Sequence, residues 1–477
     1  MTATCELLVV GAGPAGMTAA IVAARHGVDV MLVDEQAAPG GQIYRSITTT
    51  PLRDRSVLGR DYWYGEALVK ALTESAVRYE PSTAVWAITR LGDTSGEPLF
   101  DVACSSGGAT RIVRTRRLLL ATGALERPFP FPGWTLPGVM TAGAAQIALK
   151  TAAMAPSDKT VLAGTGPLLY QLAWQYRNAG VMVDLILDTT PRGRLRGALP
   201  YMGAFLRSPY FAKGRRLLHA VRTSAQVVRH VTSLTALGEK KLGRVRYAVR
   251  KYSHITRADH LIVHQGVVPH INLARAAGLR LRWNDLQACW APRVDEWGAS
   301  SQPGIMVAGD GAGIAGALAA EYRGRRAGLW AACELGHLSA ARRDAQAGEV
   351  EAALARVLRG RDFIDAMYLP SENFRCPADE TIICRCEEVT AAQVRDSVRL
   401  GCRGPNQVKA FTRCGMGPCQ GRFCGLTVAE IIARTRGVPV SEVGYYRLRY
   451  PTKPVTLDEL AALPQTEESR RAVVRSV

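Results

Sequence analysis

The segment CELLVVGAGPAGMTAAIVAARHGVDVMLVDEQ, residues 5–36, reads as one strand–turn–helix–strand unit. Its apolar run LLVV is typical of a buried parallel strand. A G-x-G-x-x-G turn follows, then an alanine-rich helix and a second strand, VDVMLVD, that ends at Asp34. A lone glycine motif is a weak signal, but the complete unit in this order predicts a dinucleotide-binding domain.

The three glycines of the turn have separate physical roles. Gly11 permits the tight turn, Gly13 lets the backbone approach a pyrophosphate, and Gly16 lets helix and strand pack closely. The helix N-terminus offers free N–H groups to phosphates, and an acid at the end of the second strand accepts hydrogen bonds from ribose hydroxyls. The predicted nucleotide-binding residues of this unit are Gly11, Gly13, Pro14, Ala15, Gly16, Asp34 and Glu35.

Three later stretches distinguish FAD from NAD as the ligand. They are APGGQIYR at 38–45, RRLLLATGALERPFPFPG at 116–133 and GIMVAGDGAGIAGALAAEYRGRRAG at 304–328. In this order they resemble the two-dinucleotide-domain flavoproteins, the family that includes thioredoxin and glutathione reductases. The resemblance implies FAD, with the Ala-Thr-Gly turn near the flavin and the aspartate of the last motif at the ribityl or phosphate region. The site residues added in this way are Gly41, Gln42, Ala121, Thr122, Gly123, Gly309 and Asp310.

A second unit of the same kind, KTVLAGTGPLLYQLAWQYRNAGVMVDLILDTT, spans 159–190. It keeps Gly164, Gly166 and the strand-end Asp188, but Leu169 replaces the third glycine. A small residue at that position normally allows close helix packing. The sequence therefore predicts a retained fold with a degenerate NAD(P)H site. The alternative, a working NAD(P)H site, stays open.

The reaction of disulfide reductases needs two neighbouring cysteines beside the flavin. Cys5, Cys104, Cys289 and Cys333 are isolated in the sequence, and none forms a C-x-x-C pair. They are interpreted as small core residues.

Five of the eleven cysteines fall in ICRCEEVT at 383–390 and TRCGMGPCQGRFCG at 412–425. Closely spaced thiolates on glycine-rich loops hold iron–sulfur clusters or zinc. The C-x2-C knuckles usual for zinc are absent from both stretches, which favours iron–sulfur. The residues between the two stretches predict a helix with Thr390 as its N-cap.

These cysteines resemble the [2Fe-2S] domain of the bacterioferritin-associated ferredoxin type, which ends several flavoprotein dehydrogenase subunits. In that domain the ligands are C-x-C and then C-x4-C. The resemblance maps them onto Cys384, Cys386, Cys419 and Cys424. Cys414 creates a second C-x4-C with Cys419, so the pair 414/419 is an alternative to 419/424. Cys376 and Cys402 are interpreted as bystanders.

Nearly the whole chain resembles the larger (alpha or A) subunit of heteromeric amino-acid dehydrogenases. That group includes opine oxidases, D-hydroxyproline and proline dehydrogenases and hydrogen cyanide synthase. The most specific stretches are 121–146, 295–321 and 410–425. The resemblance implies an electron-transfer subunit with FAD and a [2Fe-2S] cluster, and in some relatives FMN between subunits. It also implies a glycine- or sarcosine-oxidase-like beta subunit that oxidises a C–N bond, and a quinone or other carrier as acceptor.

No catalytic residue is assigned to this chain, because no Ser-His-Asp arrangement, H-E-x-x-H motif or P-loop occurs in it. His264 and His270 are interpreted as structural or loop histidines. Two other functions stay open. One is an NAD(P)H-dependent reductase of its own cluster, and the other is a redox- or iron-responsive binding module.

Charge and composition narrow the remaining classes. The net charge is +19 and the pI about 9.7, but the arginines are scattered and no nucleic-acid motif appears. The basic and apolar stretch at 191–222 could face lipid head groups, or pack on a partner or on its own domain. No apolar run approaches the roughly 18–20 residues that span a bilayer. The sequence predicts a cytoplasmic protein without a transmembrane segment.

The predicted fold is α/β, a disulfide-reductase-like flavoprotein with two dinucleotide-binding domains and a small helical [2Fe-2S] domain at the C-terminus. Residues 1–152 and 286–335 are expected to form the FAD domain, with 153–285 inserted as the degenerate second fold. A helical linker is expected at 336–375 and the cluster domain at 376–435. The tail, 436–477, is a candidate for subunit contact.

Overall fold

The computed structural model describes residues 2–91, 97–156 and 159–463. Its largest sheet has seven strands, with β1 (Thr2–Val10) parallel to both β2 (Val30–Val33) and β6 (Ala109–Leu120). The strands before and after the first glycine turn are therefore direct neighbours. The order along this sheet is β3 (Arg78–Glu80), β2, β1, β6, β5 (Leu99–Ser106) and β4 (Ala84–Leu91).

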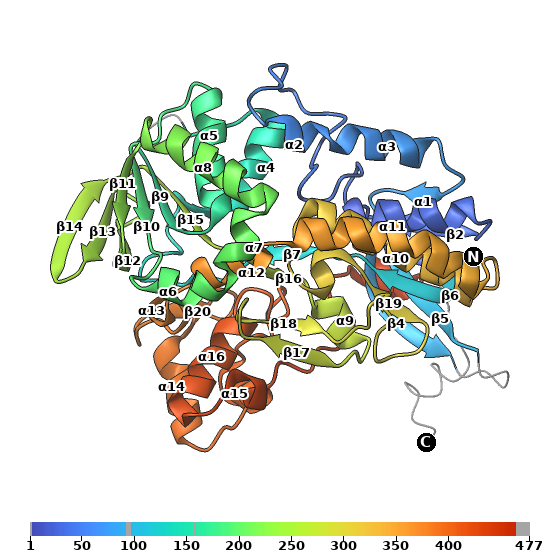
Figure 1. The fold of residues 1–477 in the computed structure, drawn as a ribbon. Coiled ribbons are helices and arrows are strands. Elements are labelled where there is room, and N and C mark those ends of the chain that lie inside the picture. Colours follow the sequence, from blue (N-terminus) through green and yellow to red (C-terminus); the bar gives the residue numbers. More distant parts are fainter. Residues whose placement is uncertain (1, 92–96, 157–158, 464–477) are drawn as a thin grey trace, which may run out of the picture.

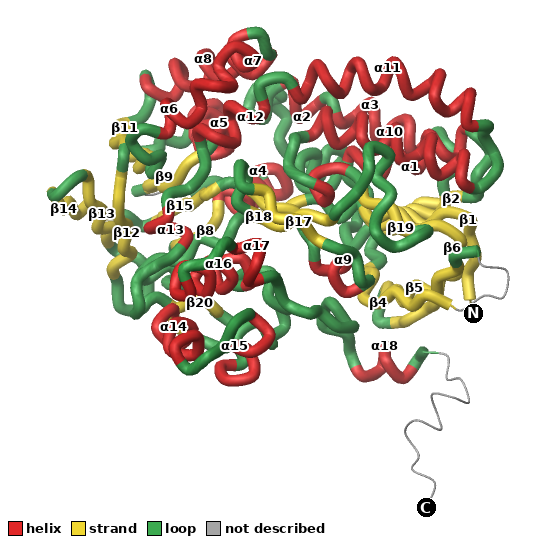
Figure 2. Tube along the Cα trace, turned by 60° about the horizontal axis from the view of Figure 1, so that its bottom comes forward, coloured by secondary structure: helices red, strands yellow, loops and turns green. Residues whose placement is uncertain are grey.

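The same sheet receives a strand from much later in the chain. β19 (Ile305–Val307) pairs in parallel with β6, and α10 (Ala317–Glu334) then packs along α1 (Pro14–Arg25). A Cβ at Gly324 would lie 2.3 Å from the Ala15 carbonyl oxygen, and one at Gly328 would lie 2.6 Å from that of Ala19. The small residues of both helices thus allow a contact closer than larger side chains permit. Figure 2 shows α1, α10 and α11 (Ala340–Leu358) on one face of the sheet.

A second, all-parallel sheet carries the second glycine turn. Its order is β11 (Gln226–Arg229), β10 (Leu185–Asp188), β9 (Thr160–Thr165), β15 (His260–Gln265) and β8 (Val139–Thr141). The helices α4 (Ala142–Ala152), α5 (Pro167–Asn178) and α8 (Pro209–Arg222) pack around it. An antiparallel sheet of β12 (Val231–Leu237), β13 (Arg244–Val249) and β14 (Tyr252–Arg257) forms one edge of the molecule (Figure 1).

Shorter elements connect these units. The remaining two-stranded pairs are β7 (Ala124–Glu126) with β16 (Val267–Pro269), β17 (Leu281–Asn284) with β18 (Cys289–Pro292), and β20 (Ile382–Cys384) with β21 (Val389–Thr390). Further short α-helices are α2 (Arg60–Trp63), α3 (Gly65–Thr73), α6 (Arg194–Ala198), α7 (Met202–Leu206), α9 (Asn272–Ala276), α12 (Arg361–Met367), α13 (Glu372–Arg375), α17 (Val440–Val443) and α18 (Leu457–Ala461).

The C-terminal domain is helical, as predicted, and lies at the bottom of Figure 1. It contains α14 (Ala391–Arg399), α15 (Pro405–Thr412) and α16 (Gly425–Arg436). Thr390 is the N-cap of α14, and its side chain and that of Gln393 form a reciprocal capping box. The predicted cap is confirmed, because this signal is local and needs no tertiary contact.

The basic stretch at 191–222 packs on its own chain. The Phe205 ring stacks on Phe363 of α12 at 4.1 Å between centroids, and the Tyr210 hydroxyl donates to the Val357 carbonyl of α11 at 2.8 Å. Leu195, Leu199 and Leu206 remain exposed. The stretch therefore contacts its own chain over part of its surface: α8 packs on α5 of the same fold, and the two contacts above reach the 336–375 segment.

Within the described ranges, no helix combines the length and the apolar character needed to cross a membrane.

The chain after the helical domain returns to the first sheet. Thr452 N donates to the Trp86 carbonyl at 3.0 Å, and Lys453 forms an ion pair with Glu35. The predicted subunit-contact tail therefore contacts the FAD domain of its own chain at this point. Its last residues, 464–477, lie outside the described residues.

Lys150 of α4 is buried beneath the 41–45 segment. Its Nζ donates to the carbonyls of Gln42 and Ile43 at 3.2 and 2.9 Å, and to Gln146 Oε1 at 3.0 Å. Burial, and secondarily the charge of Arg45, lowers the pKa of Lys150 from 10.5 to about 7. Between these two values the unfolded chain binds a proton that the folded chain has released.

We therefore expect stability to rise with pH from about 7 to 10.5, because the unfolded state binds more protons there. In Lys150→Met the free energy of unfolding should rise less steeply with pH. The difference in slope should be up to about 1.4 kcal/mol per pH unit, which is the value for one proton. Urea unfolding of wild type and variant at pH 7 to 9.5 measures the difference. Lys70→Met is the control, because its exposed ammonium lies on α3. Parallel pH profiles for wild type and Lys150→Met would contradict the prediction.

Candidate cofactor and metal sites

The first glycine turn is held by the acid at the end of β2. Ala12 N donates to Asp34 Oδ2 at 2.5 Å, and Gln36 N donates to Asp34 Oδ1 at 2.7 Å. Gly40 N donates to the Ala12 carbonyl at 2.8 Å. Hydrogen bonds to the Asp34 carboxylate and to the Ala12 carbonyl thus join the turn, the end of β2 and the 38–45 segment.

The predicted FAD-binding residues from distant segments converge on this turn. A Cβ at Gly11 would lie 2.5 Å from the Ala121 carbonyl oxygen, and one at Gly41 would lie 2.8 Å from the Gly13 Cα. A Cβ at Gly309 would lie 2.7 Å from the Ala15 Cβ. Pro14, Ala15 and Gly16 form the first turn of α1, and Asp310 Oδ1 accepts from the backbone N–H groups of Ala315 and Gly316 at 2.8 and 3.0 Å.

The Ala-Thr-Gly turn lies beside the last motif. Gly311 is its neighbour: a Cβ there would be in ordinary van der Waals contact, at 3.5 Å, with both the Gly123 nitrogen and the Thr122 hydroxyl. A Cβ added at Gly123, Gly313 or Gly316 would meet no protein atom within 4 Å. A side chain at any of these three glycines would therefore meet open space and no protein atom. These residues fit FAD.

The second glycine turn is arranged differently. Thr190 N donates to Asp188 Oδ1 at 2.8 Å, just as Gln36 N donates to Asp34 Oδ1 in the first site. The difference lies at Oδ2, which in Asp188 accepts from the Tyr170 side-chain hydroxyl at 2.6 Å and in Asp34 accepts from the backbone of the glycine turn. Leu169 is fully buried in the position of the third glycine. The His264 ring lies 3.6 Å from a Cβ built at Gly166. These contacts support the predicted degeneracy of this site.

His264 and Glu126 form a buried pair that the sequence did not predict. His264 Nδ1 lies 2.8 Å from Glu126 Oε2, and Gly143 N donates to Glu126 Oε1 at 2.5 Å. This fits the structural interpretation of His264. The two residues are separated by 138 positions in the chain. No local pattern in the sequence could have revealed their contact.

The cysteines of the C-terminal domain fall into two adjacent groups. The Sγ atoms of Cys384, Cys414 and Cys424 all lie within 4.8 Å of one another, and all three residues are buried. Cys386, which is exposed, contacts Cys419, which is partly buried. Of the predicted ligands, Cys384 and Cys424 thus lie in one group with Cys414, and Cys386 and Cys419 lie in the other. The choice of four ligands stays a prediction. Cys376 and Cys402 are buried outside the group of three, and Cys5, Cys104 and Cys289 are also buried, whereas Cys333 is only partly so.

The electrostatics of the buried thiols favour metal binding. The thiols of Cys414 and Cys424 both donate to Cys384 and lower the pKa of that residue to about 2. The same hydrogen bond raises the pKa of Cys414 to about 12. A thiolate among donors is a site that a cation can occupy by displacing protons. Iron or zinc fits these residues, and glycine-rich backbone close to the sulfurs is usual for iron–sulfur ligation.

One short segment joins the Ala-Thr-Gly turn to the cysteine loops. Thr122 Oγ1 donates to the His270 carbonyl at 2.9 Å, and His270 N donates to the Gly123 carbonyl at 2.9 Å. Asn272 Nδ2 then donates to the Gln420 carbonyl at 2.9 Å, in the loop between Cys419 and Cys424. We call residues 267–275 the bridge segment. The predicted flavin site and the predicted cluster site thus lie on opposite sides of this segment and are separated by only a few residues.

The surroundings of the bridge segment are tightly packed. Burial, together with the charge of Arg422, lowers the pKa of His270 to about 4, so this imidazole is neutral at physiological pH. Arg275 Nε donates to the Tyr446 carbonyl at 3.2 Å. A small cavity lies beside the segment, lined by Val268, Asn272, Trp290, Arg422 and Tyr445 among others. From the sequence, His270 is interpreted as a structural or loop histidine, and no contact between two domains is predicted for its segment.

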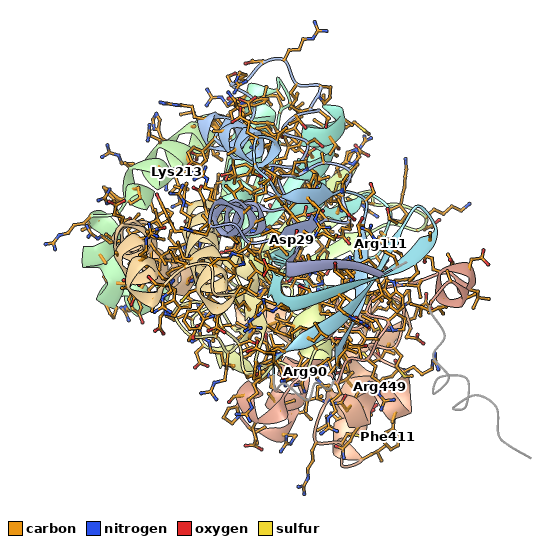
Figure 3. The ribbon with its side chains drawn as sticks, turned by 90° about the vertical axis from the view of Figure 1, so that its right-hand side faces the viewer. Asp29, Arg90, Arg111, Lys213, Phe411 and Arg449 are labelled. Carbon is orange, nitrogen blue, oxygen red and sulfur yellow. The ribbon has the colours of Figure 1, made fainter. Side chains whose placement is uncertain are left out.

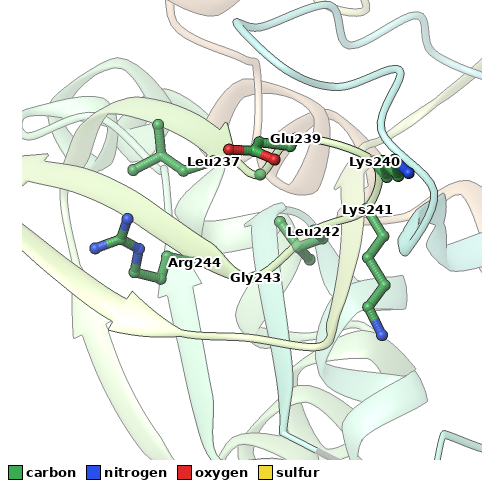
Figure 4. Close-up of a pocket in the computed structure, with 8 residues that line it drawn as sticks. Leu237, Glu239, Lys240, Lys241, Leu242, Gly243 and Arg244 are labelled. Atoms are coloured by element: carbon green, nitrogen blue, oxygen red, sulfur yellow. The ribbon is translucent and has the colours of Figure 1, made fainter.

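A second hollow lies on the hairpin between β12 and β13, far along the chain from either site. Leu237–Arg244 line it, and Figure 4 shows Glu239, Lys240 and Lys241 on the turn itself. All three of these residues are exposed. Because the hollow is formed by a single turn and contains none of the predicted site residues, it is not a candidate for the chemistry.

Comparison with known proteins places the chain in a family. Residues 5–334 match the family model of pyridine nucleotide-disulphide oxidoreductases, and 378–463 match that of the sarcosine oxidase A3 domain. The A subunit of opine oxidase from Rhizobium meliloti is 48% identical over 98% of this chain and 89% of its own length. The HcnB subunit of hydrogen cyanide synthase from Pseudomonas protegens is 31% identical over 97% of this chain and 98% of its own.

A solved structure agrees with this fold. L-proline dehydrogenase from P. horikoshii superimposes with a TM-score of 0.71 at 22% identity, over 96% of this chain and 80% of its own. At that identity the likeness concerns the fold alone. The match to the opine oxidase protein is far stronger and extends over nearly the full length of both chains. The chain therefore belongs to the family of opine oxidase A subunits, flavoprotein oxidoreductases built on the pyridine nucleotide-disulphide oxidoreductase fold.

Proposed function

We propose that this chain is the electron-transfer subunit of a heteromeric dehydrogenase. In this assembly a partner flavoprotein subunit, similar to glycine and sarcosine oxidases, oxidises the C–N bond of an amino acid, imino acid or opine. The present chain accepts the electrons and relays them to a quinone or another carrier. The family membership and the sarcosine oxidase A3 domain support the assembly, and the resemblance allows FMN at the subunit interface.

The bridge segment is the observation that carries this proposal. It hydrogen-bonds to Thr122 and Gly123 at one end and to the Gln420 carbonyl at the other. FAD at the first site would exchange two electrons, and a [2Fe-2S] cluster at the second would exchange one at a time. In the proposal Gly11, Gly13, Asp34 and the residues around them hold FAD. Cys384, Cys386, Cys419 and Cys424 hold the cluster.

The protein's own groups would position these cofactors. The N-terminus of α1 would hold the diphosphate, because free N–H groups at a helix N-terminus favour negative charge. His270, neutral at physiological pH, adds no charge between the two sites. On the outer side, Phe411, Met416 and Phe423 are exposed around the cysteine loops, and Figure 3 shows Phe411 at the edge of the C-terminal domain. Exposed apolar side chains of this kind suit a partner protein.

The alternative, an NAD(P)H-dependent reductase, requires a functional second fold. The Tyr170 side chain donates to Asp188 Oδ2, a contact that the first site lacks, and Leu169 fills the place of the third glycine. A ribose would have to displace the Tyr170 hydroxyl. These contacts favour electron input from a protein partner over input from a nicotinamide. A redox- or iron-responsive binding module remains a weaker alternative, since such a module needs no complete flavin site.

Anaerobic absorbance of the purified chain tests the proposal. NADH and NADPH should leave the flavin oxidised, whereas dithionite should bleach it. Once a glycine-oxidase-like partner is present, an opine, proline or glycine should bleach it too. Prompt stoichiometric bleaching by NADH would overturn the proposal in favour of the reductase.

Asn272→Leu should slow the appearance of the reduced-cluster signal severalfold while FAD and iron contents stay unchanged, because it removes the hydrogen bond from the bridge segment to the Gln420 carbonyl.

A further inference from the structure

Five thiols surround the proposed cluster site, one more than its four ligand positions. Cys386 and Cys419 form an outer pair that is accessible from the surface. Cys384, Cys414 and Cys424 form an inner group, and each is at most 1% exposed. The thiols are therefore divided unequally, with two outside and three inside.

A [2Fe-2S] cluster takes two cysteine thiolates on each iron. In the proposed cluster, the outer pair would supply the two ligands of one iron. The inner group then offers three thiols for the two positions on the other iron. Tetrahedral ligands with metal–sulfur bonds of about 2.3 Å hold their sulfurs about 3.8 Å apart. The inner sulfurs all lie within 4.8 Å of one another, so any two of them are close enough to share a metal after a small shift.

Cys414 and Cys424 are equivalent in their relation to Cys384. The Sγ atoms of both residues lie within 4.8 Å of the Cys384 Sγ, and within 4.8 Å of each other. The C-x-C motif supplies Cys384 as one inner ligand, and the geometry leaves its companion undecided between Cys414 and Cys424.

Tyr446 gives an independent reason to count Cys414 among the ligands. Its side chain is 1% exposed, and its hydroxyl lacks a hydrogen-bond partner of ordinary geometry among the described residues. The hydroxyl lies beside the Cys414 thiol, and its ring is wedged against Gly415 and Gly421, where a Cβ would lie 2.6 and 2.8 Å from ring carbons. A buried donor needs an acceptor. A metal-bound thiolate at position 414 would be one.

We infer that Cys414 is an alternative ligand to Cys424 for the inner iron, so that either thiolate can complete the site with Cys384. The inference rests on the proposed function, which places a [2Fe-2S] cluster here. Exchange between the two forms breaks one sulfur–iron bond and makes the other. One proton moves from the incoming Cys414 thiol to the outgoing Cys424 thiolate, or the reverse, so charge and oxidation state are unchanged.

The test uses the full-length chain and measures iron and acid-labile sulfide per FAD, together with the EPR spectrum after dithionite reduction. The variants are Cys414→Ala, Cys424→Ala, the double variant, Cys386→Ala, and Cys402→Ala as the control, because Cys402 is buried outside the inner group. Each inner single variant should keep most of its iron and sulfide. The double variant and Cys386→Ala should lose both. Cys424→Ala should have an altered EPR spectrum.

Each other result overturns the inference in a recognisable way. If Cys424→Ala loses its cluster while retaining FAD, Cys424 is an indispensable ligand. If the alanine variant folds poorly, the isosteric Cys424→Ser variant repeats the measurement. If Cys414→Ala loses it, Cys414 is an obligatory ligand. If the double variant keeps it, neither residue is a ligand. Wild-type chain that contains FAD but no iron and sulfide, or zinc in their place, would overturn the cluster itself and with it the proposed function.

Discussion

Gly13→Ala is expected to weaken FAD binding at least about tenfold, or about 1.4 kcal/mol, while the chain stays folded. Gly13 has φ −78°, which alanine adopts freely, and an added Cβ would meet only the Gly41 Cα at 3.8 Å. The protein itself therefore tolerates the methyl group. The ligand does not, because this glycine is where the backbone must approach the pyrophosphate.

Flavin content after desalting and the Kd for FAD on reconstitution measure this effect, and circular dichroism reports the fold. Gly348→Ala in α11 is the matched control, because its Cβ would meet nothing within 4 Å. Gly16→Ala provides the contrasting case. Its Cβ would lie 1.8 Å from the Gly11 carbonyl oxygen, so it should impair folding as well as FAD binding. A Gly13→Ala chain that retains FAD like wild type would show that the diphosphate does not pass this turn.

Arg127→Met should lower the free energy of unfolding by about 3–5 kcal/mol, a large effect for one substitution. The guanidinium is 6% exposed and donates to the carbonyls of Gln265, Gln287 and Ala288 at 3.1, 2.5 and 2.9 Å. It thus joins the end of β15 in the second sheet to the turn before β18. Methionine fills much of the volume but leaves these carbonyl oxygens without their charged donor.

Urea unfolding followed by circular dichroism measures the loss. Arg399→Met is the control, because its ion pair with Asp396 is exposed and of the i,i+3 type, so removing it should cost less than about 0.5 kcal/mol. Arg127→Lys should fall between the two, since one ammonium cannot reach all three carbonyls in the guanidinium geometry. If Arg127→Met unfolds at the same urea concentration as the control, the three hydrogen bonds do not stabilise the domain junction.

The two glycine turns explain why one nucleotide site was predictable in detail and the other only by its departure from the pattern. Around Gly11 the backbone segments approach so closely that a Cβ would clash, and a glycine in the sequence indicates such a position directly. Around Gly164, the sequence predicted degeneracy from Leu169 alone. The hydrogen bond from Tyr170 to Asp188, which occupies the ribose-binding carboxylate, depends on how α5 packs against β10.

The C-terminal domain divides in the same way. Thr390 and Gln393 form the predicted cap because both partners lie within one helical turn. The spacing of the cysteines predicted a metal site, but it left the pair 414/419 as an alternative to the pair 419/424. Spacing counts residues along a loop, whereas ligand choice depends on which sulfurs the folded loop brings together. The structure places Cys414 with Cys384 and Cys424, and Cys386 with Cys419.

By itself the sequence determined the features that depend on local backbone conformation and side-chain size. These are the strand–turn–helix units, the close packing of small helical residues, the missing dithiol and the existence of a thiol-rich C-terminal domain. Only the tertiary structure decided which distant groups meet. Three contacts join positions that are remote in the chain. The bridge segment connects Gly123 with Gln420, Lys453 pairs with Glu35, and the Tyr446 hydroxyl lies beside Cys414. Such contacts are set by how whole domains pack, and no local pattern encodes them.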